Sequence, residues 1–427
     1  MRKADALIFD AIGTPRGTGK ARFLPRRVAV LGAGTMGAAI AYLAAAAGLD
    51  VVLRDVSLEA AGRGRGRAAA VVDRRVADGL ITVDEGETLL GRITPTDSLA
   101  ATTGVDLVIE AVFEDAPLKA AVLREIDALA APGALIASNT STLPITGLAA
   151  SVSRPADFVG LHFFSPAERM PLLEIIAGKQ TSSETVARAL DVAALLGKTP
   201  IVVNDSRGFF TSRVISTLID EALAMLLEGV PAASVEEASL QAGYPTAVLA
   251  LVDELSIELL RKVRRQYRAA AAADGVPWET RPAERLVDAM LDVHGRGGRA
   301  AGGGFYDYPD GRRARLWPGL SELAPTPARL PSQRDLEERM LFIEALEATR
   351  CHEEGVIESV ADANVGSILG IGFPAWTGGV LAYINGYAGG PPGFVSRARE
   401  LRQSYGERFE PPDSLLALAA RGGCYSD

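Results

Sequence analysis

The spacing of hydrophobic positions changes along the chain, and each spacing predicts a different architecture. From Arg27 onward, short β-branched runs alternate with alanine-rich stretches of helical length, such as Pro117–Leu129 and Ser183–Leu196. Strands that alternate with helices predict a parallel sheet with helices on both faces. We therefore expect an α/β, doubly wound, Rossmann-type sheet. The strands predicted by this pattern are Arg27–Leu31, Val51–Arg54, Leu107–Ala111, Ala134–Ala137, Phe158–Leu161 and Ile201–Val203.

Helical periodicity takes over after Asn204, where the strand-like runs stop, and it begins with Gly208–Glu228. Gly302–Trp317 and Pro325–Ser332 are rich in loop-forming residues and are predicted linkers, and the helical pattern resumes at Asp335. Two all-α domains are therefore expected after the sheet. The predicted division is a linker helix or remnant at 1–24, a Rossmann domain at 25–204, and helical domains at 205–325 and 326–427.

The two helical segments carry a weak internal repeat. The paired motifs, in the same order, are Glu-Ala-Leu at 221–223 and 344–346, Glu-Gly-Val at 228–230 and 354–356, Ser-Val at 234–235 and 359–360, and Gly-Tyr-Pro at 243–245 with Gly-Phe-Pro at 372–374. Alanine-rich helices can match by chance, and the spacings differ by a few residues. The shared order of four elements nevertheless favours a duplication.

Composition narrows the class of protein. A hydrophobic fraction of 48% with 23% charged residues is typical of a soluble globular protein. The net charge of −9 argues against a nucleic-acid partner but leaves room for a small anionic ligand. Only two cysteines occur, Cys351 and Cys424, without CxxC spacing, so neither a disulfide framework nor a metal site is predicted.

One stretch, residues 31–53, has the length of a membrane span. It contains Asp50, four glycines and eight weakly apolar alanines, so we expect no integral membrane segment. The first residues lack the apolar core and cleavage site of a signal peptide. The sequence therefore predicts a cytoplasmic protein.

A glycine-rich turn follows the first predicted strand. Gly32-Ala33-Gly34-Thr35-Met36-Gly37 leads into an alanine-rich helix and a second strand, and Asp55 comes next, as in the dinucleotide-binding fingerprint. Asp55 can accept hydrogen bonds from both ribose hydroxyls and would repel a 2′-phosphate. Arg54 would suit NADP, but neighbours in a strand point to opposite faces. NAD is therefore the predicted cofactor.

Polar side chains occur where later strands of the predicted sheet end, which is where ligands bind in open α/β sheets. They are Glu110 and Glu114, the segment Ser138–Ser141, and His162. Glu174 lies within the apolar run Leu172–Ile176, where a carboxylate is costly to bury without a cation or donor. A pair with His162 would explain Glu174, fix the imidazole tautomer and make His162 a better base. Taken singly, each residue has a structural explanation, and their strand-end position favours a functional one. His294 and His352 are assigned to surfaces.

Several motifs then resemble the 3-hydroxyacyl-CoA dehydrogenases. In order, they are GAGTMG, IEAVFED-x3-K, SNTSTLPI, GLHFFSP-x4-MPLLEII, LGKTPIVVND and GFFTSR, followed by LVDEL, GGGFYDYPDG and EEGV with GFPAWTGG. The later motifs are similar to the duplicated helical domains of the multifunctional fatty-acid β-oxidation α subunit, and the serine in HFFSP favours its trifunctional-enzyme branch. The similarity runs from about Arg27 to the C-terminus. It implies NAD-dependent oxidation of (3S)-3-hydroxyacyl-CoA to 3-ketoacyl-CoA, with a thiolase or a second copy of the chain as a possible partner.

The resemblance assigns roles to individual residues. His162 matches the catalytic base, Glu174 its carboxylate partner, and Ser141 a serine that contacts the substrate and the nicotinamide. The predicted cofactor contacts are Gly32, Gly34, Thr35, Met36, Gly37, Asp55, Val112, Phe113, Glu114, Lys119, Asn139, Ser141 and Ser165. Ser141, Ser165 and Ser212 are the substrate contacts implied by the resemblance. Bacterial members commonly have asparagine at the positions of Ser165 and Ser212, and serine has a shorter reach.

Coenzyme A also needs cations for its phosphates. The basic run after Asp55 consists of Arg63, Arg65, Arg67, Arg74 and Arg75, and we predict Arg74 and Arg75 as substrate contacts. A solvated helix face explains the same run equally well.

Two further functions stay open. One is a dehydrogenase of free 3-hydroxy acids, although such enzymes generally use a lysine base. The other is a catalytically weak NAD-binding scaffold subunit for a thiolase complex. The hydratase/isomerase half of the multifunctional enzymes has no counterpart in this sequence, so we expect either a stand-alone dehydrogenase or a piece of a fusion.

Overall fold

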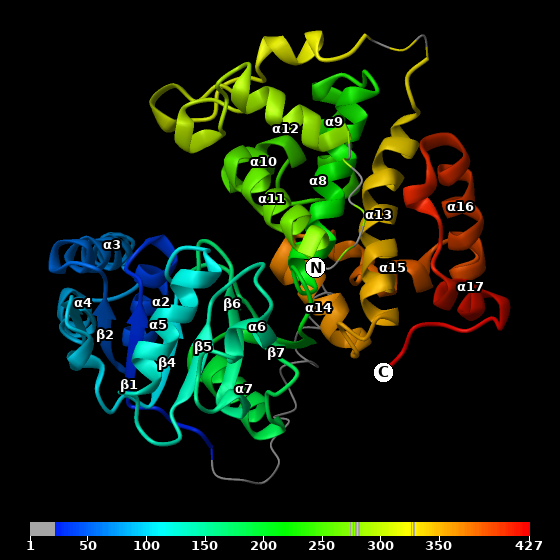
Figure 1. Cartoon of the computed structure of the whole chain (residues 1–427). Coiled ribbons are helices and arrows are strands. Elements are labelled where there is room, and N and C mark those ends of the chain that lie inside the picture. Colours follow the sequence, from blue (N-terminus) through cyan, green and yellow to red (C-terminus); the bar gives the residue numbers. More distant parts are fainter. Residues whose placement is uncertain are drawn as a thin grey trace. The chain divides into compact units, whose positions relative to one another are not determined.

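The computed structural model describes residues 22–427 except 274, 276, 278, 279, 281, 326 and 328. The chain divides into two compact units, which are described separately (Figure 1). The sheet unit comprises described residues 22–211 and the short segment 355–358, and the helical unit comprises 212–354 and 359–427. Asn204 shows how the segment joins the sheet unit, because its backbone N–H donates to the Val356 carbonyl at 2.8 Å. The predicted remnant at 1–24 lies mostly outside the described residues.

Within the described residues, eight strands form one sheet in the order β3-β2-β1-β4-β5-β6-β7-β8. The strands are β1 (Arg27–Leu31), β2 (Asp50–Arg54), β3 (Ile93–Thr96), β4 (Leu107–Glu110), β5 (Leu135–Ser138), β6 (Phe158–Phe163), β7 (Leu172–Ala177) and β8 (Thr199–Asn204). The reversal of strand order beside β1 confirms the doubly wound, Rossmann-type sheet. β3 was not predicted, because it is a short edge strand that contains Pro95 and alternates few apolar residues.

One pair of strands departs from the predicted parallel arrangement. β7 pairs with β6 in the antiparallel direction, while the other neighbouring strands pair in parallel. The connection from β6 to β7 spans only residues 164–171, and a parallel crossover needs a dozen residues or more. This antiparallel register places His162 directly opposite Glu174. β6 also extends beyond the predicted end at Leu161, so His162 lies inside the strand.

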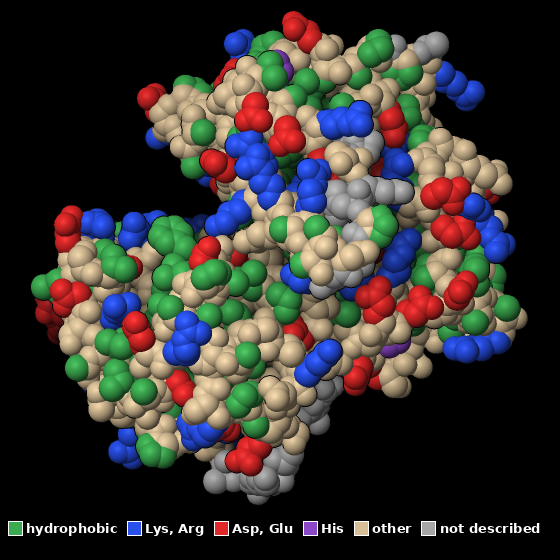
Figure 2. Space-filling view, viewed as in Figure 1, with side chains coloured by type: hydrophobic (Ala, Val, Ile, Leu, Met, Phe, Trp, Pro, Cys, Tyr) green, Lys and Arg blue, Asp and Glu red, His purple; other side chains and the backbone are tan. Residues whose placement is uncertain are grey.

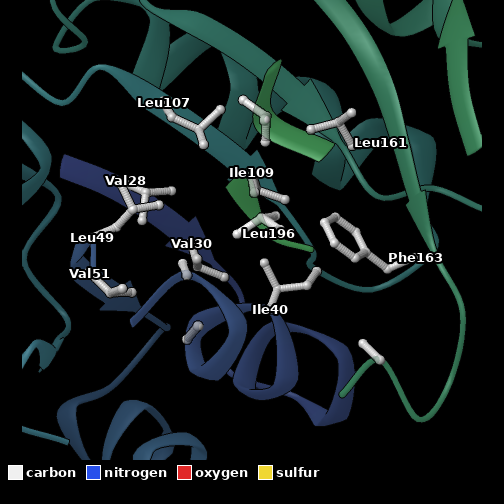
Figure 3. Packing of buried hydrophobic residues seen from close by; sticks show 14 of the residues in the cluster. Val28, Val30, Ile40, Leu49, Val51, Leu107, Ile109, Leu161, Phe163 and Leu196 are labelled. Carbon is white, nitrogen blue, oxygen red and sulfur yellow. The ribbon is translucent and has the colours of Figure 1, made fainter. Parts of the chain in front are cut away.

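Helices cover both faces of the sheet (Figure 1). They are α2 (Thr35–Ala46), α3 (Leu58–Ala77), α4 (Val83–Gly91), α5 (Ala116–Asp127), α6 (Ile145–Ala149) and α7 (Ser183–Leu195), with short 3₁₀ helices η1 (Leu99–Thr102) and η2 (Pro155–Asp157). Alternate strand residues such as Val28, Val30 and Ile109 form one core cluster with Ile40 of α2 and Leu196 at the end of α7 (Figure 3). Burial of these apolar side chains stabilises the sheet at ~25 cal/mol per Å². The rigid sheet then fixes the positions of its strand ends in space.

The helical unit contains ten α-helices among its described residues. They are α8 (Thr211–Leu227, whose first residue belongs to the sheet unit), α9 (Ala232–Ala242), α10 (Val248–Leu255), α11 (Ile257–Ala273), α12 (Pro282–Asp292), α13 (Gln333–Glu353), α14 (Val360–Ile371), α15 (Val380–Gly386), α16 (Gly390–Tyr405) and α17 (Asp413–Ala420). Short 3₁₀ helices are η3 (Arg299–Ala301), η4 (Pro309–Gly311), η5 (Pro318–Glu322), η6 (Ala375–Thr377) and η7 (Glu407–Phe409). Both predicted repeats lie here: α9 and α14 each end at a left-handed glycine, Gly243 and Gly372. The division of this unit into two domains stays a prediction.

One predicted linker is a packed loop instead. In residues 302–317, Phe305 is fully buried, and the backbone N–H groups of Phe305 and Tyr306 each donate to Asp253 at 2.8 Å. Glycine and proline therefore mark a tight, folded loop here and not a loose connection. Every described helix falls short of the length and apolarity that crossing a bilayer would require.

Candidate active site

The glycine turn after β1 has the geometry of a dinucleotide-binding loop. Gly32 has a left-handed φ of 97°, and a Cβ there would lie 2.5 Å from the Ala111 carbonyl oxygen. A Cβ on Gly37 would overlap the Gly32 carbonyl, so the helix can approach the turn only with glycine there. A Cβ on Gly34 would meet nothing within 4 Å, which leaves open space beside the loop. The three glycines therefore play the separate roles that the fingerprint requires.

The first turn of α2 and Asp55 complete this loop. The N-cap residue of α2, Gly34, provides no side-chain hydrogen bond, so the helix presents backbone N–H groups and its positive dipole end. Asp55 follows β2, and its two carboxylate oxygens accept from Ala33 N and Val56 N, each at 2.7 Å. Pyrophosphate would fit the uncapped helix end, and the remaining lone pairs of Asp55 can accept from ribose hydroxyls. These residues therefore fit NAD.

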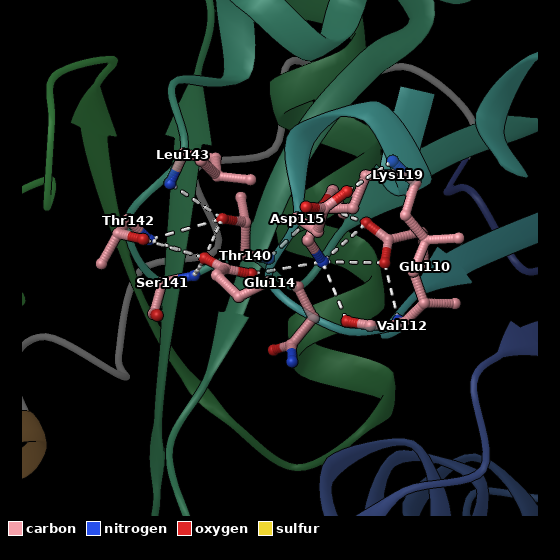
Figure 4. Close-up of polar contacts among 12 residues, drawn as sticks. Glu110, Val112, Glu114, Asp115, Lys119, Thr140, Ser141, Thr142 and Leu143 are labelled. Carbon is pink, nitrogen blue, oxygen red and sulfur yellow. Dashed lines mark hydrogen bonds and ion pairs between the residues drawn. The ribbon is translucent and has the colours of Figure 1, made fainter. Parts of the chain in front are cut away.

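A buried network joins the ends of β4 and β5 (Figure 4). Glu110 is fully buried, and Lys119 Nζ lies 2.8 Å and 3.1 Å from its two oxygens. Glu110 also accepts from Ser138 Oγ at 2.6 Å and from Val112 N at 2.7 Å. Lys119 was predicted to contact the cofactor, and the structure places its ammonium under the strand ends, 1% exposed. In this position it holds Glu110 and the Val112 carbonyl in place.

Glu114 organises the loop that contains Ser141. Its Oε1 accepts from Thr140 Oγ1 at 2.5 Å, from Ser141 N and Thr142 N at 3.1 Å each, and from Thr142 Oγ1 at 3.0 Å. Its Oε2 lies 3.3 Å from Lys119 Nζ. Burial alone would raise the pKa of Glu114, but Lys119 and the loop donors together lower it below its ordinary value. Figure 4 shows the Ser141 side chain pointing away from this carboxylate.

His162 and Glu174 form the predicted pair. His162 Nδ1 lies 2.8 Å from Glu174 Oε2, with His162 7% exposed and Glu174 fully buried. The rings of Phe164 and Phe209 lie with their centroids 4.5 Å and 6.2 Å from that of His162. An imidazole held by a buried carboxylate among aromatic rings has one fixed orientation and one occupied nitrogen. Such a pair can remove a proton from a hydroxyl group.

Glu174 has further donors that the sequence analysis missed. Phe210 N and Thr211 N donate to its Oε1 at 3.0 Å and 3.1 Å, and Thr211 Oγ1 donates to Oε2 at 2.6 Å. The segment Gly208-Phe209-Phe210-Thr211 could have indicated these donors, because a glycine and two aromatic residues precede a helix there. Only the fold reveals that this turn closes over a strand 36 residues earlier.

A pocket of about 260 Å³ gathers several predicted residues from separate segments. Thr35 and Met36 of α2, Arg74 of α3 and Ser165 after β6 all line it, as does Arg67. The structure therefore brings together predicted cofactor contacts, a predicted substrate serine and one of the two predicted arginines. Arg75 is not among the residues that line this pocket.

Lys198 supports one wall of the pocket. Its Nζ donates to the carbonyl oxygens of Ala167 at 2.5 Å and Met170 at 2.7 Å. Burial lowers the pKa of this lysine, and Glu168 offsets part of the effect. Lys198 thereby fixes the loop that carries Ser165.

The arginines of α3 differ in their contacts. Figure 2 shows basic side chains along the top edge of the sheet unit, where Figure 1 places α3. Arg63 pairs with Glu59 at 2.5 Å, Arg65 donates to the carbonyls of Leu90 and Ile93, Arg67 donates to Ala33 O at 3.1 Å, and Arg74 lies 3.9 Å from Glu168. Three of these four side chains therefore have structural partners close by, while the Arg74 contact is long and exposed.

The remaining predicted residues lie as follows. Phe113 is 83% exposed beside the strand ends, and Val112 is half-buried. Asn139 accepts from Phe163 N at 2.9 Å and so ties β5 to β6. Ser212 is the second residue of α8 and belongs to the helical unit.

Among the described residues, no cluster of side chains has the make-up of a metal site.

Comparison with known proteins gives a consistent result. Residues 27–206 match the NAD binding domain of 3-hydroxyacyl-CoA dehydrogenase, and residues 208–308 match the C-terminal domain of the same family. The chain is 35% identical to a fatty acid oxidation complex subunit alpha from Shewanella amazonensis, over 98% of the chain and 59% of that relative. The chain thus spans well under two thirds of this relative's length.

Two solved structures are also similar. The (S)-3-hydroxybutyryl-CoA dehydrogenase from Ralstonia eutropha is 35% identical, with a TM-score of 0.61 over 67% of this chain and 100% of that one. The 3-hydroxybutyryl-CoA dehydrogenase from Escherichia coli is 26% identical, with a TM-score of 0.78 over 93% of this chain and 99% of that one.

Proposed function

The chain belongs to the 3-hydroxyacyl-CoA dehydrogenase family of NAD-dependent oxidoreductases, and from this premise we propose that it oxidises (3S)-3-hydroxyacyl-CoA to 3-ketoacyl-CoA in fatty-acid β-oxidation. The observation that carries the proposal is the His162–Glu174 pair, which lies in the same unit as the dinucleotide loop. A 3-hydroxyl group needs a base for its proton, and NAD, when bound, supplies the hydride acceptor.

In this proposal His162 acts as the base. Glu174 occupies Nδ1, so Nε2 accepts the proton of the 3-hydroxyl group. The charge that develops on the imidazole is stabilised by the Glu174 carboxylate at 2.8 Å. The aromatic rings of Phe164 and Phe209 keep the ring from turning, so little reorganisation is needed during proton transfer.

Ser141 and Ser165 are proposed to contact the substrate, and Ser212 stays a prediction. The contacts on α3 favour Arg74 over Arg75 as a CoA ligand, because Arg74 is exposed at the pocket and its link to Glu168 is long. The Arg75 Nε is buried without a hydrogen-bond partner among the described residues. We also propose a thiolase or a second copy of the chain as partner, as the sequence resemblance implies, and a cytoplasmic location, as the sequence pattern predicts.

The decisive experiment compares substrates. The purified chain and NAD are mixed with (S)-3-hydroxybutyryl-CoA, longer (S)-3-hydroxyacyl-CoA thioesters, the (R) isomers or free 3-hydroxybutyrate, and NADH formation is followed by absorbance. We expect turnover of the (S) thioesters alone. Turnover of the free acid would favour a free-acid dehydrogenase, and NADH binding without any turnover would favour a scaffold subunit.

Replacing the base tests its role. His162→Gln should lower kcat by at least ~100-fold, because general base catalysis contributes about that much or more. NADH binding, measured by fluorescence titration, should stay within about twofold of wild type. His294→Gln, which alters an exposed histidine of the helical unit, is the control and should leave kcat unchanged. Near-normal turnover of His162→Gln would refute the assignment.

A further inference from the structure

Thr211 contacts both oxygens of the Glu174 carboxylate. Its backbone N–H donates to Oε1 at 3.1 Å and its hydroxyl donates to Oε2 at 2.6 Å. Oε2 is the oxygen that lies 2.8 Å from His162 Nδ1. Thr211 therefore donates a hydrogen bond to each oxygen of the Glu174 carboxylate. A carboxylate held at both oxygens cannot rotate about its Cγ–Cδ bond.

The turn before Thr211 is built to aim these donors. Gly208 and Phe209 both have left-handed backbone angles, with φ values of 75° and 51°. A phenylalanine in this region is a steric outlier, which persists only where its surroundings hold it. Phe209 is fully buried and its ring lies beside His162. The strained turn thus directs the N–H groups of Phe210 and Thr211 at Glu174.

No other side chain around Glu174 in the described part of the chain replaces the Thr211 hydroxyl as a hydrogen-bond donor. β8 brings Ile201 into register beside Glu174, and β6 brings His162. Asp205, just past β8, already accepts from Ile145 N and Thr146 N. Among the described residues, His162 and Thr211 are the side chains that hydrogen-bond to Glu174. Loss of the Thr211 hydroxyl would therefore leave Oε2 with the imidazole as its one side-chain partner.

We propose that Thr211 is a positioning residue for the proposed base, whose hydroxyl keeps Glu174 Oε2 in line with His162 Nδ1. This inference rests on the proposed function of the His162–Glu174 pair. Thr211 thus acts on His162 through Glu174 and does not itself contact the substrate. Small misplacements of a catalytic group cost up to ~100-fold in rate, so a hydroxyl at this point has a measurable effect.

Two substitutions separate the hydroxyl from the shape of the side chain. Thr211→Val keeps the shape and removes the hydroxyl, and Thr211→Ser keeps the hydroxyl. We expect Thr211→Val to lower kcat about tenfold, with KM for NAD and for 3-hydroxybutyryl-CoA within about twofold of wild type. Thr211→Ser should restore kcat to within about twofold. The control Thr217→Val removes another hydroxyl of α8, which donates to Val214 O, and should leave kcat unchanged.

A double-mutant cycle tests whether Thr211 acts through Glu174. In a Glu174→Gln background, Thr211→Val should cause little additional loss of kcat. Equal kcat values for wild type and Thr211→Val, a Thr211→Ser variant as slow as Thr211→Val, or full additivity in the cycle would each overturn the inference. If Thr211→Val is too unstable to purify, Thr211→Cys, whose thiol is a weak donor, takes its place with the same expected order.

A second measurement does not depend on turnover, so it distinguishes failure of this inference from failure of the proposed function. The chain has three histidines, and ¹⁵N-histidine labelling with a His162→Gln reference spectrum identifies the His162 signals. We expect the His162 Nδ1 proton to exchange with water faster in Thr211→Val than in wild type and Thr211→Ser. Identical exchange in all three would overturn the inference, whatever substrate the wild type oxidises.

Discussion

Single carboxylates of the sheet unit hold neighbouring segments in place around the candidate site. Glu110, Glu114 and Glu174 each accept several hydrogen bonds, including bonds from donors on other segments. A buried carboxylate is tolerated only when its oxygens are paired, so each of these residues fixes the backbone of its donors. At the residue scale, the candidate site is therefore ordered by side chains that lie behind the reacting groups.

Glu114 provides a test of this ordering. Glu114→Gln removes the charge that four loop donors and Lys119 share, so we expect the free energy of unfolding at pH 7 to fall by about 1–3 kcal/mol. The pKa of Glu114 is lowered in the folded protein, with burial opposing Lys119 and the loop hydroxyls. A lowered pKa stabilises the fold above the ordinary carboxyl pKa and loses this effect as the pH falls through the lowered value.

The difference between wild type and Glu114→Gln should therefore be largest at pH 7 and shrink towards acid. Urea unfolding at several pH values checks this expectation. Glu125→Gln, at an exposed position of α5, is the control and should show no such difference. A pH-independent difference would mean that shape, and not charge, explains the loss.

The sequence predicted the contact between His162 and Glu174 but not the other donors to Glu174. Glu174 was conspicuous because an isolated carboxylate in an apolar run demands a partner, and His162 was near in sequence. Thr211 gave no such signal, because a threonine at the start of a helix has many ordinary explanations. Its contact with Glu174 depends on how a turn 36 residues later folds back, which side-chain type and spacing do not encode.

At the scale of elements, the packing of α3 on the glycine turn depends on one glycine among several. A Cβ on Gly64 would lie 2.6 Å from Ala33 Cβ, whereas Cβ atoms on Gly62 or Gly66 would meet nothing within 4 Å. Gly64→Ala should push α3 away from the turn and weaken NADH binding severalfold. Gly62→Ala is the matched control and should stabilise the helix by up to ~1 kcal/mol.

Thermal unfolding and NADH titration of both variants distinguish the two positions. We expect Gly64→Ala to lower the Tm and Gly62→Ala to raise it, although the two positions are only two residues apart. If both variants behave alike, α3 does not restrain the glycine turn as its packing suggests.

The elements themselves were predicted unequally. The strands β1, β2 and β4, and helices α5 and α7, were found within one or two residues of their bounds, because buried runs and helical periodicity are strong local signals. β3 and β7 are not among the predicted strands, and the antiparallel direction of β7 was missed with it. An edge strand with Pro95 lacks a periodic pattern, and strand direction depends on the length of the connection after β6, which the pattern of apolar residues does not report.

At the scale of the whole molecule, equivalent glutamates of the predicted repeat have unlike partners. Glu221 lies 2.6 Å from Arg339 and 2.5 Å from Arg408, both in the second copy. Glu344 accepts from the Tyr244 hydroxyl of the first copy, and its Oε1 is buried without a partner among the described residues. The two segments of the predicted repeat thus contact each other through polar side chains.

Glu344 should make stability depend on pH. Burial raises the pKa of Glu344 from 4.5 to about 8, and the hydrogen bond from Tyr244 offsets part of this. A raised carboxyl pKa gives stability that is fully present below about pH 4.5 and lost as the pH rises through 8, by at most ~1.4 kcal/mol per pH unit. Glu344→Gln keeps the acceptor for Tyr244 and should remove this decline between pH 5.5 and 8.

Urea unfolding of the helical unit at pH 5.5, 7 and 8 measures the effect. Glu237→Gln changes an exposed glutamate of α9 and serves as the control. A parallel pH dependence in wild type and Glu344→Gln would show that this buried carboxyl does not titrate in the range.

The short segment 355–358 has a consequence for how the chain can be divided. These four residues complete the sheet unit at Asn204, yet helical-unit residues precede and follow them in the chain. A polypeptide that ended at Thr211 would therefore lack the Val356 carbonyl to which Asn204 N donates. The sheet unit is thus continuous in space but not in the sequence.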